Sequence, residues 1–338
     1  MKNTQKIKEF GINILFLLVV ILVLLVFFEI ALRVSYNGWS NFNSEMWRYS
    51  IDVKKISDIP NVSHEHQPKK SSILYGVEIK TNSLGFRDKE YNKLKSNNSK
   101  RILVLGDSVT LGWGVKISDA YSEVLESLLN NNNNNNNESV NYEVMNSAVG
   151  NYNTEMEVNM LKQYIPLDFD SVIVGFFPND AEKTHIVKKD LAYQFKSRLY
   201  LYPFLWDRYV KIKFLLMKGS GDYSSKIHEF YSEEYGGREV IKRYFSLLNN
   251  IADENNLKVY IVMIPQFYNE FSDYDSGYIH DFIEELCDDN NFTCIDTLDD
   301  FNGYNLSEII ISREDAHPNK LGHRLIAERI YEVMKNEK

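Results

Sequence analysis

Residues 101–114 read RILVLGDSVTLGWG, and this stretch decides the fold class. The apolar run Ile102–Leu105 has the composition of a β-strand and ends abruptly in Gly106-Asp107-Ser108. A buried strand of a parallel sheet reads as a continuous apolar run, and ligands bind just beyond the carboxyl ends of such strands. The pattern therefore predicts that Ser108 lies on a turn at the mouth of a parallel sheet. The alternative is that Asp107 and Ser108 only cap a helix, a position that both residue types favour.

A catalytic serine needs a base that takes its proton, an acid that orients the base, and donors aimed at an oxyanion. His317 is the candidate base, because Glu314 and Asp315 stand just before it in the sequence. Pro318 follows it and favours a rigid loop leading into an amphipathic run, Leu321–Met334. Considered alone, such a histidine is more often a loop residue beside a solvated acidic pair.

Two further segments offer hydrogen-bond donors. Gly150 follows the β-like stretch Val140–Met145, and a glycine lets a backbone N–H approach a substrate closely. Asn179 follows the strand-like stretch Ser171–Phe177, and its side-chain amide can donate to an oxyanion. Each residue considered separately is more often part of an ordinary turn. Their order along the chain with Ser108 is what favours a shared site.

This order of serine, glycine, asparagine and histidine resembles the SGNH branch of the GDSL hydrolases. Residues 106–114 resemble the first conserved block of that family, 146–150 the second, 175–180 the third and 315–319 the last. The resemblance covers roughly residues 100–335. It implies a three-layer α/β fold with a doubly wound parallel sheet in the flavodoxin-like order 2-1-3-4-5.

The resemblance also implies a role for each matching residue. Ser108 is the expected nucleophile and His317 the expected base, and the oxyanion donors are the backbone N–H groups of Ser108 and Gly150 with the amide of Asn179. The family's usual last block places an aspartate three positions before the histidine. Here Glu314 stands at that position and Asp315 stands two before. We favour Asp315 as the orienting acid and hold Glu314 as the alternative.

Alternating strand and helix patterns support the same fold class. We expect helices over residues 117–129 and 238–254, strands over 258–264 and 292–296, and a closing helix over 321–334. The asparagine run at 130–137 is expected to be a solvated loop.

The N-terminus predicts a membrane anchor. Residues 10–28 contain no charged side chain, and together with Ile30–Leu32 they are long enough to cross a bilayer core, which takes about 20 apolar residues. The run is longer than the apolar part of a cleaved signal, and no small-residue cleavage pattern follows it. Lys2, Lys6 and Lys8 precede the span, which predicts that residues 1–9 are a cytoplasmic tail and that the rest lies outside the cytoplasm.

The sequence predicts three parts after the cytoplasmic tail. They are a membrane anchor at 10–32, a membrane-proximal segment at 33–99 packed beside the core, and a hydrolase domain at 100–335. An aromatic-rich insertion at about 181–237 is either a lid over the site or a helix packed on the core. Residues 81–88, TNSLGFRD, recur in membrane-anchored members of the family that the chain resembles.

Composition narrows the function further. The net charge of −9 argues against a nucleic-acid partner. No Cys/His cluster has the spacing of metal ligands, so we expect no metal and no cofactor. The two cysteines, Cys287 and Cys294, are either free thiols or a small disulfide.

The function we expect is that of a membrane-anchored serine ester hydrolase acting through an acyl-enzyme on O-acyl or acetyl esters of envelope glycans or lipids. An O-acyltransferase of the same fold is one alternative. A non-catalytic binding protein that retains the fold is another.

Overall fold

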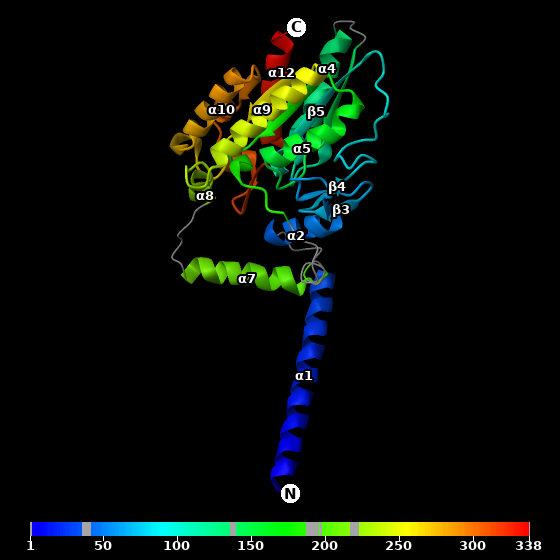
Figure 1. The fold of residues 1–338 in the computed structure, drawn as a ribbon, viewed down its shortest axis with the longest axis vertical. Helices are drawn as coiled ribbons and strands as arrows, with labels where there is room; N and C mark the ends of the chain where they lie inside the picture. The colour runs from blue at the N-terminus through cyan, green and yellow to red at the C-terminus, as the bar shows by residue number, and fades with distance from the viewer. Residues whose placement is uncertain are drawn as a thin grey trace. The chain divides into compact units, whose positions relative to one another are not determined.

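The computed structural model describes residues 2–35, 42–135, 140–186, 196, 198–216 and 223–337. Its centre is a sheet of five strands in the order β6-β5-β7-β8-β9, and every neighbouring pair is parallel (Figure 1). This confirms the predicted order 2-1-3-4-5. The strands are β5 (Ser99–Gly106), β6 (Asn141–Asn146), β7 (Ser171–Phe176), β8 (Lys258–Met263) and β9 (Thr293–Asp296).

The two faces of the sheet are covered by different helices, which confirms the three-layer α/β class. Successive side chains of a strand point to opposite faces. Leu103 and Leu105 therefore join one core cluster, while Ile102 and Val104 join the other. The first cluster is completed by α5 (Thr154–Tyr164), α9 (Gly237–Asn255) and α10 (Gly277–Asp289), and the second by α4 (Tyr121–Asn135) and α12 (Lys320–Asn336).

The expected elements agree with the observed ones to within a few residues, with one exception. The helix expected to end at Leu129 continues as α4 to Asn135, so the first six asparagines of the run are helical rather than part of a loop. Asn130 explains part of the difference, because its side chain accepts a hydrogen bond from the Tyr142 N–H (2.8 Å) and donates to the Tyr142 carbonyl (3.0 Å). This amide fixes the end of the helix to the start of β6. The last two asparagines of the run lie outside the described residues.

Three small antiparallel pairs surround the sheet, β1 with β2, β3 with β4 and β10 with β11. Cys287 of α10 and Cys294 of β9 are joined by a disulfide. The pairs are β1 (Lys54–Ile56), β2 (His64–His66), β3 (Ser71–Leu74), β4 (Val77–Lys80), β10 (Ile310–Ser312) and β11 (Asp315–Pro318). The other α-helices are α1 (Lys2–Ser35), α2 (Phe42–Asp52), α3 (Ser108–Leu111), α7 (Leu201–Leu216), α8 (Tyr223–Phe230) and α11 (Leu306–Ile309). Short 3₁₀ turns lie at Ile117–Asp119, Ile165–Leu167, Pro178–Ala181, Phe271–Asp273 and Leu298–Phe301.

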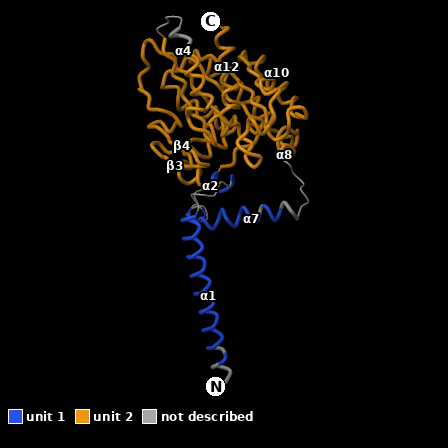
Figure 2. The backbone as a smooth tube through the Cα atoms, turned by 180° about the vertical axis from the view of Figure 1, so that it is seen from behind, with its two compact units in different colours: residues 1–47, 188–220 blue, residues 48–187, 221–338 orange. Residues whose placement is uncertain are grey.

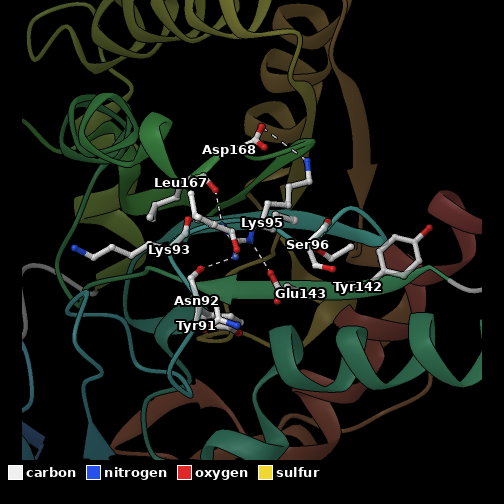
Figure 3. A network of polar contacts seen from close by, with 12 residues as sticks. Tyr91, Asn92, Lys93, Lys95, Ser96, Tyr142, Glu143, Leu167 and Asp168 are labelled. Carbon is white, nitrogen blue, oxygen red and sulfur yellow. Dashed lines mark hydrogen bonds and ion pairs between the residues drawn. The ribbon is translucent and has the colours of Figure 1, made fainter.

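Arg101 fixes the chain that leads into β5. Its guanidinium is fully buried and pairs with Glu143 of β6 (2.6 Å). It also donates to the carbonyls of Asn92 (2.6 Å) and Leu167 (2.8 Å), so that one cation joins three segments. Figure 3 labels its partners Asn92, Glu143 and Leu167. A buried charge is tolerated when it is paired and its remaining donors are satisfied. Arg101 therefore holds the start of β5 in place.

The chain divides into two compact units (Figure 2). One comprises residues 1–47 with 188–220, and the other comprises 48–187 with 221–338. These units differ from the expected plan, because both the membrane-proximal segment and the insertion are divided between them. In the first unit, the stretch Lys8–Ser35 of α1 is long and apolar enough to cross a membrane.

Candidate active site

Strand β5 presents Ser108 at its carboxyl end. β5 ends at Gly106, and Ser108 is the first residue of the short helix α3. Asp107 caps this helix, because its carboxylate accepts a hydrogen bond from the Val109 N–H (2.8 Å). Gly106 has a φ of +156°, and a Cβ at this position would lie 2.1 Å from Oγ1 of Thr110. The turn between β5 and Ser108 therefore requires a glycine at position 106.

The hydroxyl of Ser108 begins a hydrogen-bonded chain of three side chains. Its Oγ lies 2.8 Å from Nε2 of His317, and Nδ1 of His317 lies 2.5 Å from Oδ1 of Asp315. Because a carboxylate only accepts, Nδ1 carries the proton and Nε2 is left to accept from the serine. This tautomer is the one a general base needs.

The hairpin of β10 and β11 supplies the histidine and its carboxylate. Asp315 and His317 are alternate residues of β11, so their side chains share a face. Asp315 is buried, with 2% of its surface exposed, whereas Glu314 is exposed. Of the two acids that the sequence left open, Asp315 is therefore the one beside the imidazole.

Trp113 holds the second oxygen of that carboxylate. Its indole Nε1–H donates to Oδ2 of Asp315 at 2.9 Å, and the Trp113 side chain is completely buried. Because the two oxygens have separate donors, the carboxylate is fixed in orientation. The sequence placed Trp113 in the first block but gave it no role.

Two of the three expected oxyanion donors bind protein acceptors in this structure. The Gly150 N–H donates to the hydroxyl of Tyr49 at 3.0 Å. The amide of Asn179 donates to Oδ2 of Asp107 at 3.3 Å. The single N–H of Gly150 must leave Tyr49 to reach a substrate, whereas the Asn179 amide carries two N–H bonds. The role of both donors in catalysis stays a prediction.

The contacts of His66 show to which group the Tyr49 hydroxyl donates its proton. This hydroxyl lies 2.5 Å from Nε2 of His66, and Nδ1 of His66 lies 2.9 Å from the Gly85 carbonyl. Burial lowers the pKa of His66 to about 3, so the ring is neutral. The carbonyl accepts only, so Nδ1–H donates to Gly85 and Nε2 accepts from Tyr49. The chain of donors therefore runs from Gly150 through Tyr49 and His66 to Gly85.

Lys54 holds the other side of Gly150. Its Nζ donates to the Gly150 carbonyl at 2.5 Å and lies 4.4 Å from the centre of the Tyr49 ring. Nε2 of His64 is also close to that carbonyl, at 2.9 Å. Burial lowers the pKa of Lys54 to about 7, because the charged ammonium is poorly solvated there. A glycine expected to act in catalysis is thus fixed from both sides by residues that precede the hydrolase domain.

The pKa of Lys54 predicts a pH dependence of stability. In the unfolded chain a lysine keeps its proton to about pH 10.4, so between roughly pH 7 and 10 the unfolded state binds more protons than the folded state. Folding stability should therefore rise with pH over this range, relative to a variant without the amine. We expect the Tm of Lys54→Met minus that of the parent to fall as the pH rises from about 7 to 9.5.

The control for this measurement is Lys55→Met, whose side chain is half exposed and pairs with Glu65. Its Tm difference from the parent should stay nearly constant over the same pH range. A constant difference for Lys54→Met as well would show that Lys54 does not titrate in this range.

The motif at residues 81–88 contacts two catalytic blocks. Arg87 donates to the carbonyls of Leu111 (2.9 Å) and Gly112 (2.6 Å) at the end of α3. Asp88 accepts a hydrogen bond from the Asn146 N–H at 2.8 Å, and the Asn146 amide donates to the Thr110 carbonyl at 2.9 Å. The sequence placed this segment beside the core and gave it no further role. Its residues in fact connect the first block to the second.

Buried acids lie near the catalytic turn. Asp107, Glu157 and Asp180 are all buried, and burial raises the pKa of each carboxyl above its ordinary value. Repulsion from Glu157 and Asp107 also raises the pKa of Asp180, and repulsion from Asp107 raises the pKa of Glu157. Within the described ranges, no group of three His, Cys, Asp or Glu side chains could hold a metal ion.

No family model and no curated protein matches this chain. Similar solved structures include lipolytic proteins of the G-D-S-L family, esterases and an SGNH hydrolase. They include TesA (12% identity, 70% of this chain, 99% of that chain, TM-score 0.44). The psychrotrophic esterase EstA from Pseudoalteromonas sp. has 13% identity over 71% of this chain and 98% of that chain, with a TM-score of 0.42. A member of the lipolytic G-D-S-L family from Veillonella parvula has 15% identity over 70% of this chain and 98% of that chain, with a TM-score of 0.41. Because the sequence identity to these structures is only 12–15%, the roles of side chains are argued from the contacts described above.

Proposed function

We propose that this protein is a membrane-anchored serine ester hydrolase of the SGNH type. The observation that carries the proposal is the hydrogen-bonded chain of Ser108, His317 and Asp315, with distances of 2.8 and 2.5 Å, at the carboxyl end of β5. Such a chain is the arrangement that turns a weakly nucleophilic hydroxyl into an attacking group.

In the proposed mechanism, His317 removes the hydroxyl proton as Ser108 attacks the ester carbonyl. The carbonyl oxygen becomes an oxyanion that the N–H groups of Ser108 and Gly150 and the amide of Asn179 stabilise. His317 then protonates the leaving alcohol, which leaves an acyl-enzyme on Ser108. Water, activated by His317 in the same way, attacks the acyl-enzyme and releases the free acid.

The substrate class that we propose is an O-acyl or acetyl ester on an envelope glycan or a lipid. The test is product analysis with the full chain and an acetylated sugar, with and without an added acceptor sugar. Hydrolysis predicts that free acetate equals the ester consumed in both reactions. Transfer of the acetyl group to the acceptor would make the protein an O-acyltransferase, and no ester consumption would contradict an enzyme for this class.

We also propose that α1 anchors the chain and that the hydrolase domain lies outside the cytoplasm. Support comes from Lys2, Lys6 and Lys8 before the apolar run, since cytoplasmic flanks are enriched in Lys and Arg. The disulfide of Cys287 and Cys294 also favours an oxidising compartment. A C-terminal alkaline phosphatase fusion, active only outside the cytoplasm, should therefore be active. An inactive phosphatase with an active cytoplasmic reporter at the same position would contradict this orientation.

Tyr49 leads to a prediction about the resting state. Its hydroxyl holds the Gly150 N–H, and the proposed mechanism needs that N–H for the oxyanion. A neutral hydrogen bond contributes about 0.5–1.5 kcal/mol, so Tyr49→Phe should raise kcat/KM on a small ester by roughly two- to tenfold. The same change leaves a buried N–H without its acceptor, so the Tm should fall.

The measurement is kcat/KM and Tm of the parent, Tyr49→Phe and Tyr304→Phe. Tyr304 is an exposed tyrosine and serves as the control, because both quantities should be unchanged there. A fall of both activity and Tm in Tyr49→Phe would mean that Tyr49 positions Gly150 rather than competes for it.

A further inference from the structure

Helix α7 has an apolar side that is exposed to solvent. Leu205, Trp206, Tyr209 and Ile212 each expose between 52% and 56% of their surface. At about 100° per residue these positions lie within one third of the helix circumference. An open groove on this side is lined by Tyr202, Leu205, Trp206 and Tyr209. We refer to this surface as the aromatic face of α7.

The opposite side of α7 is occupied by contacts within the same unit. Asp207 is buried and accepts a hydrogen bond from the Asn43 amide of α2 at 3.1 Å. It also pairs with Lys211 at 2.9 Å. These contacts fix the rotation of the helix about its axis, so the aromatic face is turned away from α2.

The start of α7 is attached to the end of the apolar run of α1. The carboxylate of Glu29 accepts hydrogen bonds from the N–H groups of Tyr200 (3.0 Å) and Leu201 (2.9 Å). A carboxylate at this position satisfies the free N–H groups of a helix start and interacts well with its dipole. Both α1 and α7 belong to the first compact unit (Figure 2).

Arg33 strengthens the same attachment. Its Nε pairs with Glu29 at 2.8 Å, and its guanidinium lies 4.9 Å from the centre of the Tyr200 ring. Glu29 directly follows the uncharged residues 10–28, and Arg33 is one helical turn further on. If α1 spans a bilayer, α7 therefore begins at the level where the hydrocarbon core ends.

We propose that the aromatic face of α7 lies in the interfacial layer of the membrane that α1 spans. The occupant of this surface is lipid, and the proposal rests on the membrane anchor proposed above. Trp and Tyr are enriched at this depth, where an apolar ring body and a polar tip are both satisfied. Arg208 and Lys211 lie outside the aromatic face, where they can reach lipid phosphates.

The test uses the full chain in phospholipid nanodiscs with one spin label at a time, attached to a cysteine introduced at a chosen position. Leu205→Cys and Tyr209→Cys place the label on the aromatic face. Leu22→Cys reports on the middle of α1, and Ser246→Cys, on an exposed position of α9, reports on water. Relaxation by oxygen, which partitions into lipid, is compared with relaxation by a nickel chelate, which stays in water.

We expect labels at positions 22, 205 and 209 to be relaxed more by oxygen, and the label at 246 more by nickel. Nickel relaxation at 205 and 209 with oxygen relaxation at 22 would overturn the proposal for α7 and leave the anchor intact. Shielding of 205 and 209 from both agents would mean that protein covers the face, which also overturns it. Nickel relaxation at 22 would instead contradict the anchor itself.

Discussion

Replacing Ser108 with alanine is expected to lower kcat on an activated ester by at least about 10³-fold, without a change in Tm. Loss of the nucleophile in a comparable triad lowers kcat by about 10⁶-fold, and residual binding and oxyanion stabilisation set the lower limit. The Ser108 side chain is small and largely buried, and its hydroxyl has its hydrogen bond with His317. Removing it deletes one atom and creates almost no cavity, so folding should be unaffected.

The matched control is Ser246→Ala. Ser246 is an exposed serine of α9, and the one hydrogen bond described for its hydroxyl is to the Lys242 carbonyl of the same helix. The kcat of this variant should equal that of the parent. Retention of more than about a tenth of the parental kcat by Ser108→Ala would be incompatible with a nucleophilic Ser108.

Replacing Asp315 with asparagine is expected to lower kcat at least about a hundredfold, because loss of the carboxylate at the histidine can lower turnover by about 10⁴-fold. The carboxylate lies 2.5 Å from Nδ1 of His317 and accepts a second hydrogen bond from Trp113. An asparagine amide cannot stabilise the imidazolium as an anion does, and its NH₂ group can favour the wrong histidine tautomer.

Glu314→Gln is the matched comparison, because it makes the same chemical change one residue away on an exposed side chain. We expect it to lower kcat less than about tenfold. Both variants are measured on one ester, with thermal melts to exclude unfolding. The reverse ranking would make Glu314 the orienting acid, and small equal losses would point to a different carboxylate.

The sheet could be predicted from the sequence because its inner strands β5, β7 and β8 are buried on both faces. Each of these reads as an apolar run, as Ile102–Leu105 does before Gly106. Ser108 could be proposed because it follows such a strand directly, and His317 because two acids stand just before it and Pro318 follows. The choice between Asp315 and Glu314 needed the register of β11, which determines the side of the strand on which each carboxylate lies.

Contacts made across long separations in the chain could not be predicted. Tyr49 and Lys54 meet Gly150 about a hundred residues later, and nothing in their local sequence distinguishes them from other polar loop residues. The helical asparagines were missed for a related reason. Asparagine favours turns locally, whereas Asn130 is held by Tyr142 of the next strand. The attachment of α7 through Glu29 is likewise visible only in three dimensions.

The most direct test of the central claim is reaction of the full chain with a fluorophosphonate, followed by mass spectrometry of the digested protein. A nucleophilic serine with an adjacent base forms a stable phosphonyl ester, while ordinary serines do not react. We expect a single adduct on the peptide that contains Ser108, and no adduct in the His317→Ala variant, which keeps the serine but lacks its base. An adduct on another serine, or none on the parent protein, would contradict that claim.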